Sequence, residues 1–155
     1  MKASIARVTK TTLIFLTGLL VIFLAYAMLG TSYNRTMDRK VRDALTRVSL
    51  GRPVEAPETT EGGRTLWRVL ESEEIIVRET VVGYQSVLDL LVLLDGELSL
   101  RRFAVISGHE SAFANRALAI GEPDALSHAT TTARALERAA ARVRNDIMES
   151  EESRR

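Results

Sequence analysis

The chain of 155 residues has room for one modest domain and an additional segment, and it carries a formal net charge of +1. The near-neutral charge argues against a nucleic-acid partner, because such a surface needs a concentrated basic face. Cysteine is absent, which excludes disulfides, cysteine-ligated iron–sulfur clusters and thiolate zinc sites in this chain. No metal site is expected either, because the chain has two histidines and no H-E-x-x-H spacing.

The first feature along the chain is an uncharged segment at residues 11–34, which follows a short basic flank at residues 1–10. Its centre is almost entirely apolar, and about 20 such residues at ~1.5 Å rise span a hydrocarbon core of about 30 Å. We therefore predict one transmembrane helix that contacts membrane lipid. A cleaved signal peptide is the alternative, although the apolar run is long for one and no clear small-x-small cleavage site follows it.

The charges that flank this segment do not set its orientation. Lys2, Arg7, Lys10 and the amino terminus precede it, whereas the basic residues between 35 and 47 follow it with only Asp38 and Asp43 among them. Counted in this way, the positive-inside rule does not favour a cytoplasmic N-terminus.

After the span, apolar residues recur at helical spacing through residues 35–50, and charged residues occupy the other faces. The pattern predicts a continuation of the transmembrane helix into water, or a helix that lies on a partner. A solvated basic stem attracted to lipid head groups is the other interpretation. Gly51 and Pro53 end this helix, and residues 51–63 have the composition of a linker.

Residues 64–148 are predicted to form an α+β domain with an antiparallel sheet and a packed C-terminal helix. Residues 65–77 are expected to form two short elements with a bend near Glu73. Asp95-Gly96, between two apolar runs, predicts a hairpin whose first strand is buried on both faces. The residues expected to share one face of the second strand are Leu98, Leu100, Arg102, Ala104 and Ile106.

The last apolar pattern, over residues 131–148, repeats at three and four residues. It predicts a helix that packs one stripe on the sheet. The residues of the stripe are Ala133, Leu136, Ala140, Val143 and Ile147. Residues 149–155 are expected to form a charged, frayed tail.

Hydroxyl side chains cluster just before this helix, in the segment D-A-L-S-H-A-T-T-T that begins at Asp124. The first backbone N–H groups of a helix are unpaired, and together with the helix dipole they form a site for a phosphate. A threonine hydroxyl held there needs a separate enzyme and a divalent metal to act as a nucleophile. The alternative is that these hydroxyl groups only cap the helix.

The pattern D-x-x-S-x-A-T before a helix resembles the flavinylation motif of the FMN-binding domain family. That family includes flavin-bearing components of Rnf electron-transport complexes and of sodium-translocating NADH:quinone reductases. In it, a flavin transferase joins the phosphate of FMN to the last threonine of the motif, which corresponds to Thr130. The resemblance implies covalent FMN at Thr130, and the neighbouring cofactor-binding residues it implies are Ser127, His128, Ala129, Thr131 and Thr132. His128 stands where the family usually has glycine.

A second match to the family lies in the predicted hairpin and the loop after it. Members typically have a Gly-Tyr pair, an apolar strand, an Asp-Gly turn, and a strand that ends near a histidine and a glutamate. The corresponding pairs are Gly83-Tyr84, Asp95-Gly96 and Val105-Ile106. The family then tends to read H-x-E-T-P-G-L-G, whereas this chain reads G-H-E-S-A-F-A-N, so Glu110 matches and the Pro-Gly pair is absent. Gly83, Tyr84 and Glu110 are therefore further candidates for the flavin pocket.

The resemblance implies a membrane-anchored electron-transfer subunit in the bacterial inner membrane, with its C-terminal domain in the periplasm. Such a protein relays electrons within a multisubunit redox complex, has no independent turnover, and needs a flavin transferase for maturation. The alternative, motivated by His128 and the altered Glu110 loop, is a single-pass structural or assembly subunit that has lost FMN. An anchored sensor or adaptor domain is a third class.

Overall fold

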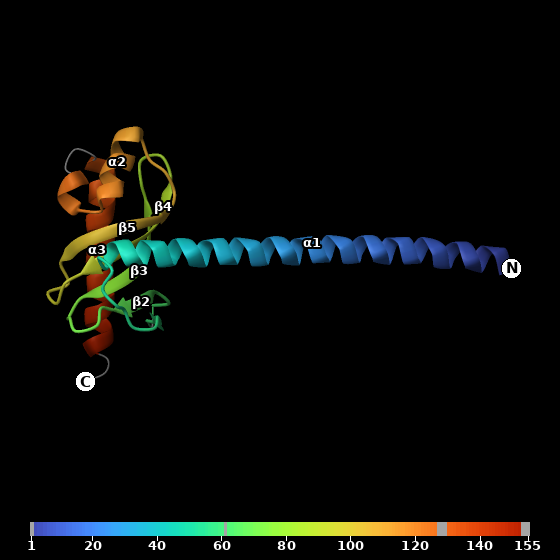
Figure 1. The fold of residues 1–155 in the computed structure, drawn as a ribbon, viewed down its shortest axis with the longest axis horizontal. Coiled ribbons are helices and arrows are strands. Elements are labelled where there is room, and N and C mark those ends of the chain that lie inside the picture. The colour runs from blue at the N-terminus through green and yellow to red at the C-terminus, as the bar shows by residue number, and fades with distance from the viewer. Residues whose placement is uncertain (1, 61, 127–129, 153–155) are drawn as a thin grey trace. The chain divides into compact units, whose positions relative to one another are not determined.

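The computed structural model describes residues 2–60, 62–126 and 130–152, and it divides into two compact units, Met1–Arg39 and Lys40–Arg155 (Figure 1). The elements in chain order are α1 (Lys2–Val48), β1 (Glu58–Thr59), β2 (Thr65–Arg68), β3 (Ile75–Val82), β4 (Val87–Leu94), β5 (Leu100–Ser107), α2 (Ala112–Ile120), the 3-10 helix η1 (Pro123–Leu126) and α3 (Thr130–Glu152). The order agrees with the predicted α+β class.

The first unit is the N-terminal part of α1. From Phe15 onward this helix is long and apolar enough to cross a membrane, and none of its most apolar stretch is buried within the protein. Among the described residues it is the one helix with these properties, which supports a single-pass anchor. The helix also includes residues 2–10, for which the sequence predicted only a flank, and it continues through residues 35–48 as predicted.

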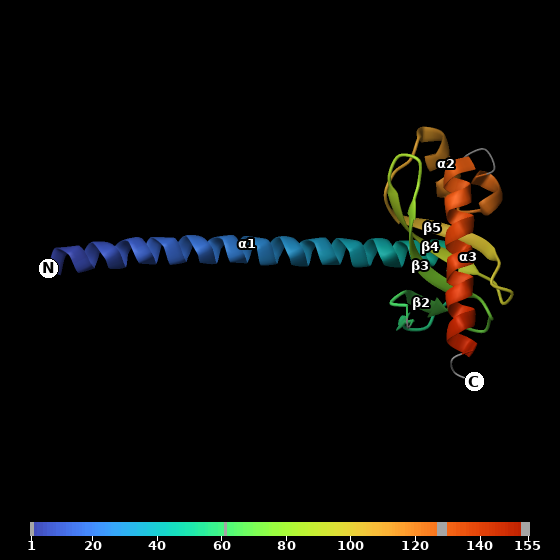
Figure 2. The ribbon, with the colours of Figure 1, turned by 180° about the vertical axis from the view of Figure 1, so that it is seen from behind.

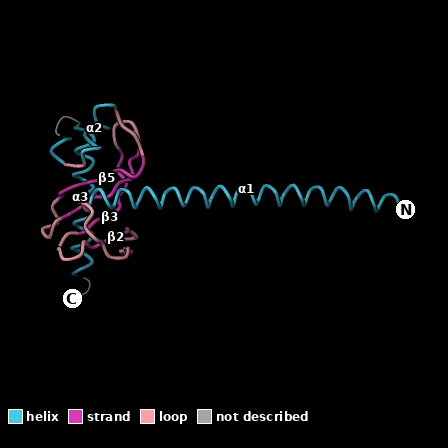
Figure 3. Tube along the Cα trace, viewed as in Figure 1, coloured by secondary structure: helices cyan, strands magenta, loops and turns pink. Residues whose placement is uncertain are grey.

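The second unit is built on a five-stranded antiparallel sheet in the order β1-β2-β3-β4-β5, so that each strand pairs with its neighbour in the sequence. Figure 3 draws the strands in magenta. The predicted hairpin at Asp95-Gly96 is confirmed, because β4 and β5 pair on either side of it. Burial of the first hairpin strand on both faces is also confirmed, since Leu88 and Leu90–Leu94 are all buried. Side chains alternate between the two faces of a strand, so β4 contributes to two apolar layers.

One of these layers lies between the sheet and α3, which crosses the strands in Figure 2. Leu90 and Phe103 of the sheet pack there with Leu136 and Val143 of α3. The stripe predicted for the closing helix is confirmed, because Leu136, Ala140 and Val143 are buried. The other two members, Ala133 and Ile147, are partly buried against the same core.

The other layer involves the last turns of α1, residues 40–48, which belong to the second unit. Ala44 and Val48 are buried, as are Ile76 and Leu91 of the sheet. Arg47 Nη2 donates a hydrogen bond to the Val105 carbonyl oxygen at 3.0 Å. The segment that the sequence left as a helix in water or on a partner therefore packs against its own domain.

Two differences from the predictions have local causes. The two faces predicted for the second hairpin strand are wrong, because a β-bulge between the pairs Leu93–Arg102 and Leu94–Leu100 interrupts the alternation. Leu98 and Leu100 consequently pack on the core that contains Phe103. The charged tail is helical as far as Glu152, because it contains helix formers and neither glycine nor proline.

Helix α2 and strand β1 had no counterpart in the predictions. Helix α2 begins after Ser111, whose side chain accepts a hydrogen bond from the Ala114 N–H, and ends at Gly121 in a left-handed conformation. The predicted linker contains β1, which pairs with β2, and Val54, which forms an isolated bridge with Val69. Residues 51–63 are thus partly incorporated into the sheet.

Candidate functional sites

The threonine predicted to carry the flavin stands at the start of a helix. Helix α3 begins at Thr130, one residue before the predicted start, and η1 precedes it. Ser127, His128 and Ala129 lie outside the described residues. Thr131 is exposed, whereas Thr132 is buried with 2% of its surface accessible. Thr132 therefore faces the interior of the domain, and only Thr131 of this described pair is accessible to a ligand from solvent.

The glutamate predicted for the flavin pocket is a buried residue with internal partners. Only 3% of Glu110 is exposed. The Gln85 backbone N–H donates to its carboxylate, at 3.3 Å from Oε1 and 3.1 Å from Oε2. The Glu110 main chain is held by Asn115, whose Oδ1 accepts from the Glu110 N–H at 2.9 Å and whose Nδ2 donates to the Glu110 carbonyl at 2.7 Å.

Gly83 makes room for this carboxylate. A Cβ atom at position 83 would collide with Oε1 of Glu110, so any larger residue there would displace the Glu110 carboxylate. The structure thus brings together two residues that the sequence singled out separately, Gly83 and Glu110, at the tip of the β3–β4 hairpin. Tyr84, the third candidate, is 74% exposed at the same tip.

A second contact fastens this tip to the loop after β5. Ser86 Oγ donates to the His109 carbonyl at 2.6 Å, and the His109 N–H donates to Ser86 Oγ at 2.9 Å. The His109 side chain is exposed, whereas Glu110 is buried. These two neighbours therefore do not share an environment, and the geometry does not make them an acid–base pair.

The sequence-predicted residues form two groups in the structure. Gly83, Tyr84 and Glu110 meet at the hairpin tip, and Thr130 to Thr132 form the first turn of α3. Within the described residues, no hydrogen bond or ion pair joins the hairpin tip to Thr131 or Thr132. The first group stabilises the β3–β4 turn. The second group forms a helix N-terminus whose sequence is rich in threonine.

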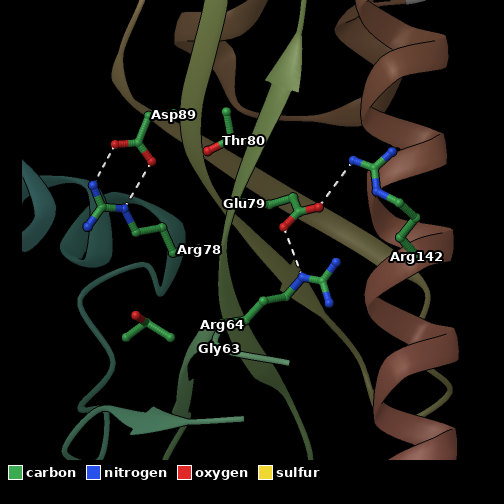
Figure 4. A pocket seen from close by; sticks show the side chains of 8 residues that line it. Gly63, Arg64, Arg78, Glu79, Thr80, Asp89 and Arg142 are labelled. Atoms are coloured by element: carbon green, nitrogen blue, oxygen red, sulfur yellow. Dashed lines mark hydrogen bonds and ion pairs between the residues drawn. The ribbon is translucent and has the colours of Figure 1, made fainter. Parts of the chain in front are cut away.

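A charged pocket that the sequence did not reveal lies beside β3 (Figure 4). Its volume is about 640 Å³. Glu79, which is 9% exposed, accepts from Arg64 Nε at 3.1 Å through one oxygen and from Arg142 Nη2 at 3.1 Å through the other. Figure 4 shows the three side chains converging from β3, from the loop before β2 and from α3. Arg64 also forms an ion pair with Asp146.

Arg78, the residue of β3 before Glu79, has its side chain on the opposite face of the sheet. Arg78 makes a bidentate contact with Asp89, with Nε to Oδ1 at 3.0 Å and Nη2 to Oδ2 at 2.7 Å. Each carboxylate that lines the pocket is therefore paired with at least one arginine. Burying a carboxylate is costly unless its charge is compensated, so this network fixes α3 and the residue-64 loop to the sheet.

Local sequence could not have identified these partners. Arg142 lies 63 positions from Glu79, and a charged residue in a strand is most often solvated. No group of three or more metal-ligating side chains occurs within the described part of the chain.

Comparison with known proteins found no match among protein-family models, curated proteins or solved structures. The fold defines a class all the same: a small α+β domain on one helix that is apolar enough to anchor it in a membrane.

Proposed function

We propose that this chain is a membrane-anchored electron-transfer subunit that carries FMN as a phosphoester at Thr130. The start of α3 at Thr130 is the observation that carries the proposal. It puts the last threonine of the D-x-x-S-x-A-T motif at the first position of a 23-residue helix. A phosphate esterified there is stabilised by the unpaired N–H groups of the first turn and by the positive end of the helix dipole.

The residues of this turn fit the phosphate end of the cofactor. Thr131 is exposed beside the attachment residue, and the buried Thr132 ties the turn to the core. The proposed attachment point therefore lies on a helix that packs against the core of the domain. When bound, FMN supplies two-electron acceptance with one-electron release, which suits a relay between one-electron carriers.

The hairpin tip has a supporting role in this proposal. Glu110 and Gly83 hold the turn in one conformation, and Tyr84 presents an exposed aromatic ring there. We assign Tyr84 to contact with the flavin ring, and Glu110 and Gly83 to positioning Tyr84. Electrons would pass to and from other subunits of a redox complex in the bacterial inner membrane, with this domain in the periplasm.

The proposal is tested by covalent flavin fluorescence. The full chain is co-expressed with a flavin transferase and separated on a denaturing gel. We expect a fluorescent band that is lost in Thr130→Val and kept in the matched variant Thr131→Val. A band that persists in Thr130→Val would reject Thr130 as the attachment site.

One observation favours a second function. The carboxylate of Glu110 and the space above Gly83 are already used by internal contacts, so this part of the predicted pocket is structural. On that basis the chain is a single-pass structural or assembly subunit without FMN. As a control, the same transferase modifies a known substrate in parallel. If that control is fluorescent and this chain gives no fluorescent band, the result supports the alternative.

A further inference from the structure

The second half of β3 has an open edge. β2 pairs with β3 only at Ile75–Val77, whereas β4 pairs with β3 from Ile75 to Val82. Among the described residues, no strand pairs with β3 on the β2 side after Val77, and residues 63–65 face this part of β3 across a pocket. An open strand edge presents unpaired backbone groups that readily pair with another extended chain.

The hairpin turn determines which backbone groups face this edge. The Gly83 N–H donates to the Ser86 carbonyl at 2.9 Å, so these two residues form a hydrogen-bonded pair. Hydrogen-bonded and non-hydrogen-bonded pairs alternate along an antiparallel ladder, and the β3–β4 register is regular. Thr80 and Val82 therefore occupy non-hydrogen-bonded pairs, and their N–H and C=O groups point away from β4 towards the open edge.

The side chains along this edge favour strand pairing. Thr80 is exposed, Val82 is 73% exposed, and Val81 between them is buried against the core. All three are β-branched and uncharged, a composition that suits an extended strand. Charged residues and prolines, which blunt many natural edges, are absent from these three positions.

A groove follows the edge between β3 and α3. The pocket of about 640 Å³ adjoins a second one of about 240 Å³, and both are lined by Thr80 and Arg142. Val82, Ala135 and Arg138 line the second pocket. The open backbone groups of β3 therefore border two pockets that share Thr80 and Arg142, and α3 forms one wall of the second.

The wall that α3 contributes is positively charged. Arg138 is exposed, its Nε donates to the Arg134 carbonyl at 3.1 Å, and it makes no ion pair with a carboxylate among the described residues. The Arg142 side chain is 52% exposed and shares Glu79 with Arg64. A second copy paired through the same edge would bring these arginines against their equivalents across a two-fold axis, and such like-charge contacts are unfavourable.

We infer that the open edge of β3 binds an extended segment of a partner protein that carries acidic side chains. The segment adds to the sheet as a strand through the backbone groups of Thr80 and Val82, and its carboxylates lie beside Arg138 and Arg142. Backbone hydrogen bonds supply the affinity of such an added strand, and the flanking side chains supply its specificity.

The test uses the full chain in a nonionic detergent and two short fluorescent peptides, one of alternating valine and glutamate and one of alternating valine and lysine. We expect the glutamate peptide to bind at least about tenfold more tightly, because like charges oppose the lysine peptide. On binding, hydrogen exchange should slow at the amides of Thr80 and Val82. The Val81 amide, which faces β4, should change little. Equal binding of the two peptides would overturn the inference.

Variants separate the backbone contribution from the charge contribution. Thr80→Pro removes an N–H that points outward, a change that edge strands tolerate. It should weaken binding of the glutamate peptide at least about tenfold, because the edge loses a backbone donor. Arg138→Glu should reverse the preference towards the lysine peptide. Arg144→Glu, the same change at an exposed position of α3 outside the groove, should leave the preference as it is.

The Arg138 reversal keeps the inference testable if Thr80→Pro fails to fold, and an unchanged preference in Arg138→Glu would reject it. Self-association is tested with Thr80→Cys, which introduces the only cysteine of the chain. A disulfide-linked dimer that forms under mild oxidation would show that a second copy occupies the edge, and would overturn the assignment to an acidic partner.

Discussion

Among the residues of this domain whose burial the structure describes, two glutamates are buried, and they are accommodated in different ways. Glu79 is 9% exposed and is paired with the charged side chains of Arg64 and Arg142. Glu110 is 3% exposed, and the contacts to its carboxylate come from the uncharged backbone N–H of Gln85 in a turn shaped by Gly83. The comparison shows that a buried carboxylate can be stabilised by distant charges or by a single turn. Only the second arrangement, that of Glu110 and Gly83, could be recognised as a pattern in the sequence.

The largest expected effect comes from removing the charge of Glu79. Glu79→Gln leaves Arg64 and Arg142 without their shared counter-ion and should lower the free energy of unfolding by about 3 kcal/mol, the low end for a broken buried pair because Arg142 is half exposed. Chemical denaturation of the full chain in detergent measures this. Glu97→Gln, at an exposed turn position, is the matched control and should change stability by less than about 0.5 kcal/mol.

A smaller effect is expected at the turn that holds Glu110. Gly83→Ala places a methyl group against Oε1 of Glu110 and should cost about 2 kcal/mol through overpacking. The collision is specific, so Glu110→Ala should relieve it. In a double-mutant cycle, the cost of Gly83→Ala should therefore fall in the Glu110→Ala background. Additive costs in that cycle would show that Gly83 is required for another reason.

Asp95, in the β4–β5 turn, combines the two kinds of stabilisation, because backbone N–H groups and an arginine both contact its carboxylate. The Ser99 N–H donates to Asp95 Oδ1 at 2.8 Å and, with Arg101 and the Glu97 N–H, lowers the pKa of this carboxyl group from its usual 3.8, although burial opposes the shift. A carboxyl whose pKa is lowered by folding stabilises the fold above its unfolded pKa, and this contribution is lost as the pH falls through the folded pKa.

Asp95→Asn should therefore lower the free energy of unfolding by about 1 kcal/mol at neutral pH. The difference from the unmodified chain should shrink as the pH falls below about 4. Unfolding curves measured across this acid range test the prediction. A difference that stays constant with pH would show that the loss is steric and does not depend on the charge.

The sequence alone predicted the parts of the fold that depend on neighbouring residues. The apolar segment at residues 11–34, the turn at Asp95 and the stripe of α3 each repeat a local pattern, and each corresponds to an element of the structure. The same local reading located Glu110 and Gly83 but not their contact. It could not assign faces in β5, because one bulge between Leu100 and Arg102 changes the alternation.

Contacts between distant segments were decided by the tertiary structure. Ala44 and Val48 cover a sheet whose strands begin later in the chain, and Glu79 finds a partner 63 positions away. The open edge of β3 exists because β2 is shorter than β3, a relation between two strands that neither sequence segment expresses. Periodicity and turn chemistry act over a few residues and so can be read from the sequence. Which distant residues contact each other, as Glu79 and Arg142 do, depends on which surfaces the folded chain brings together.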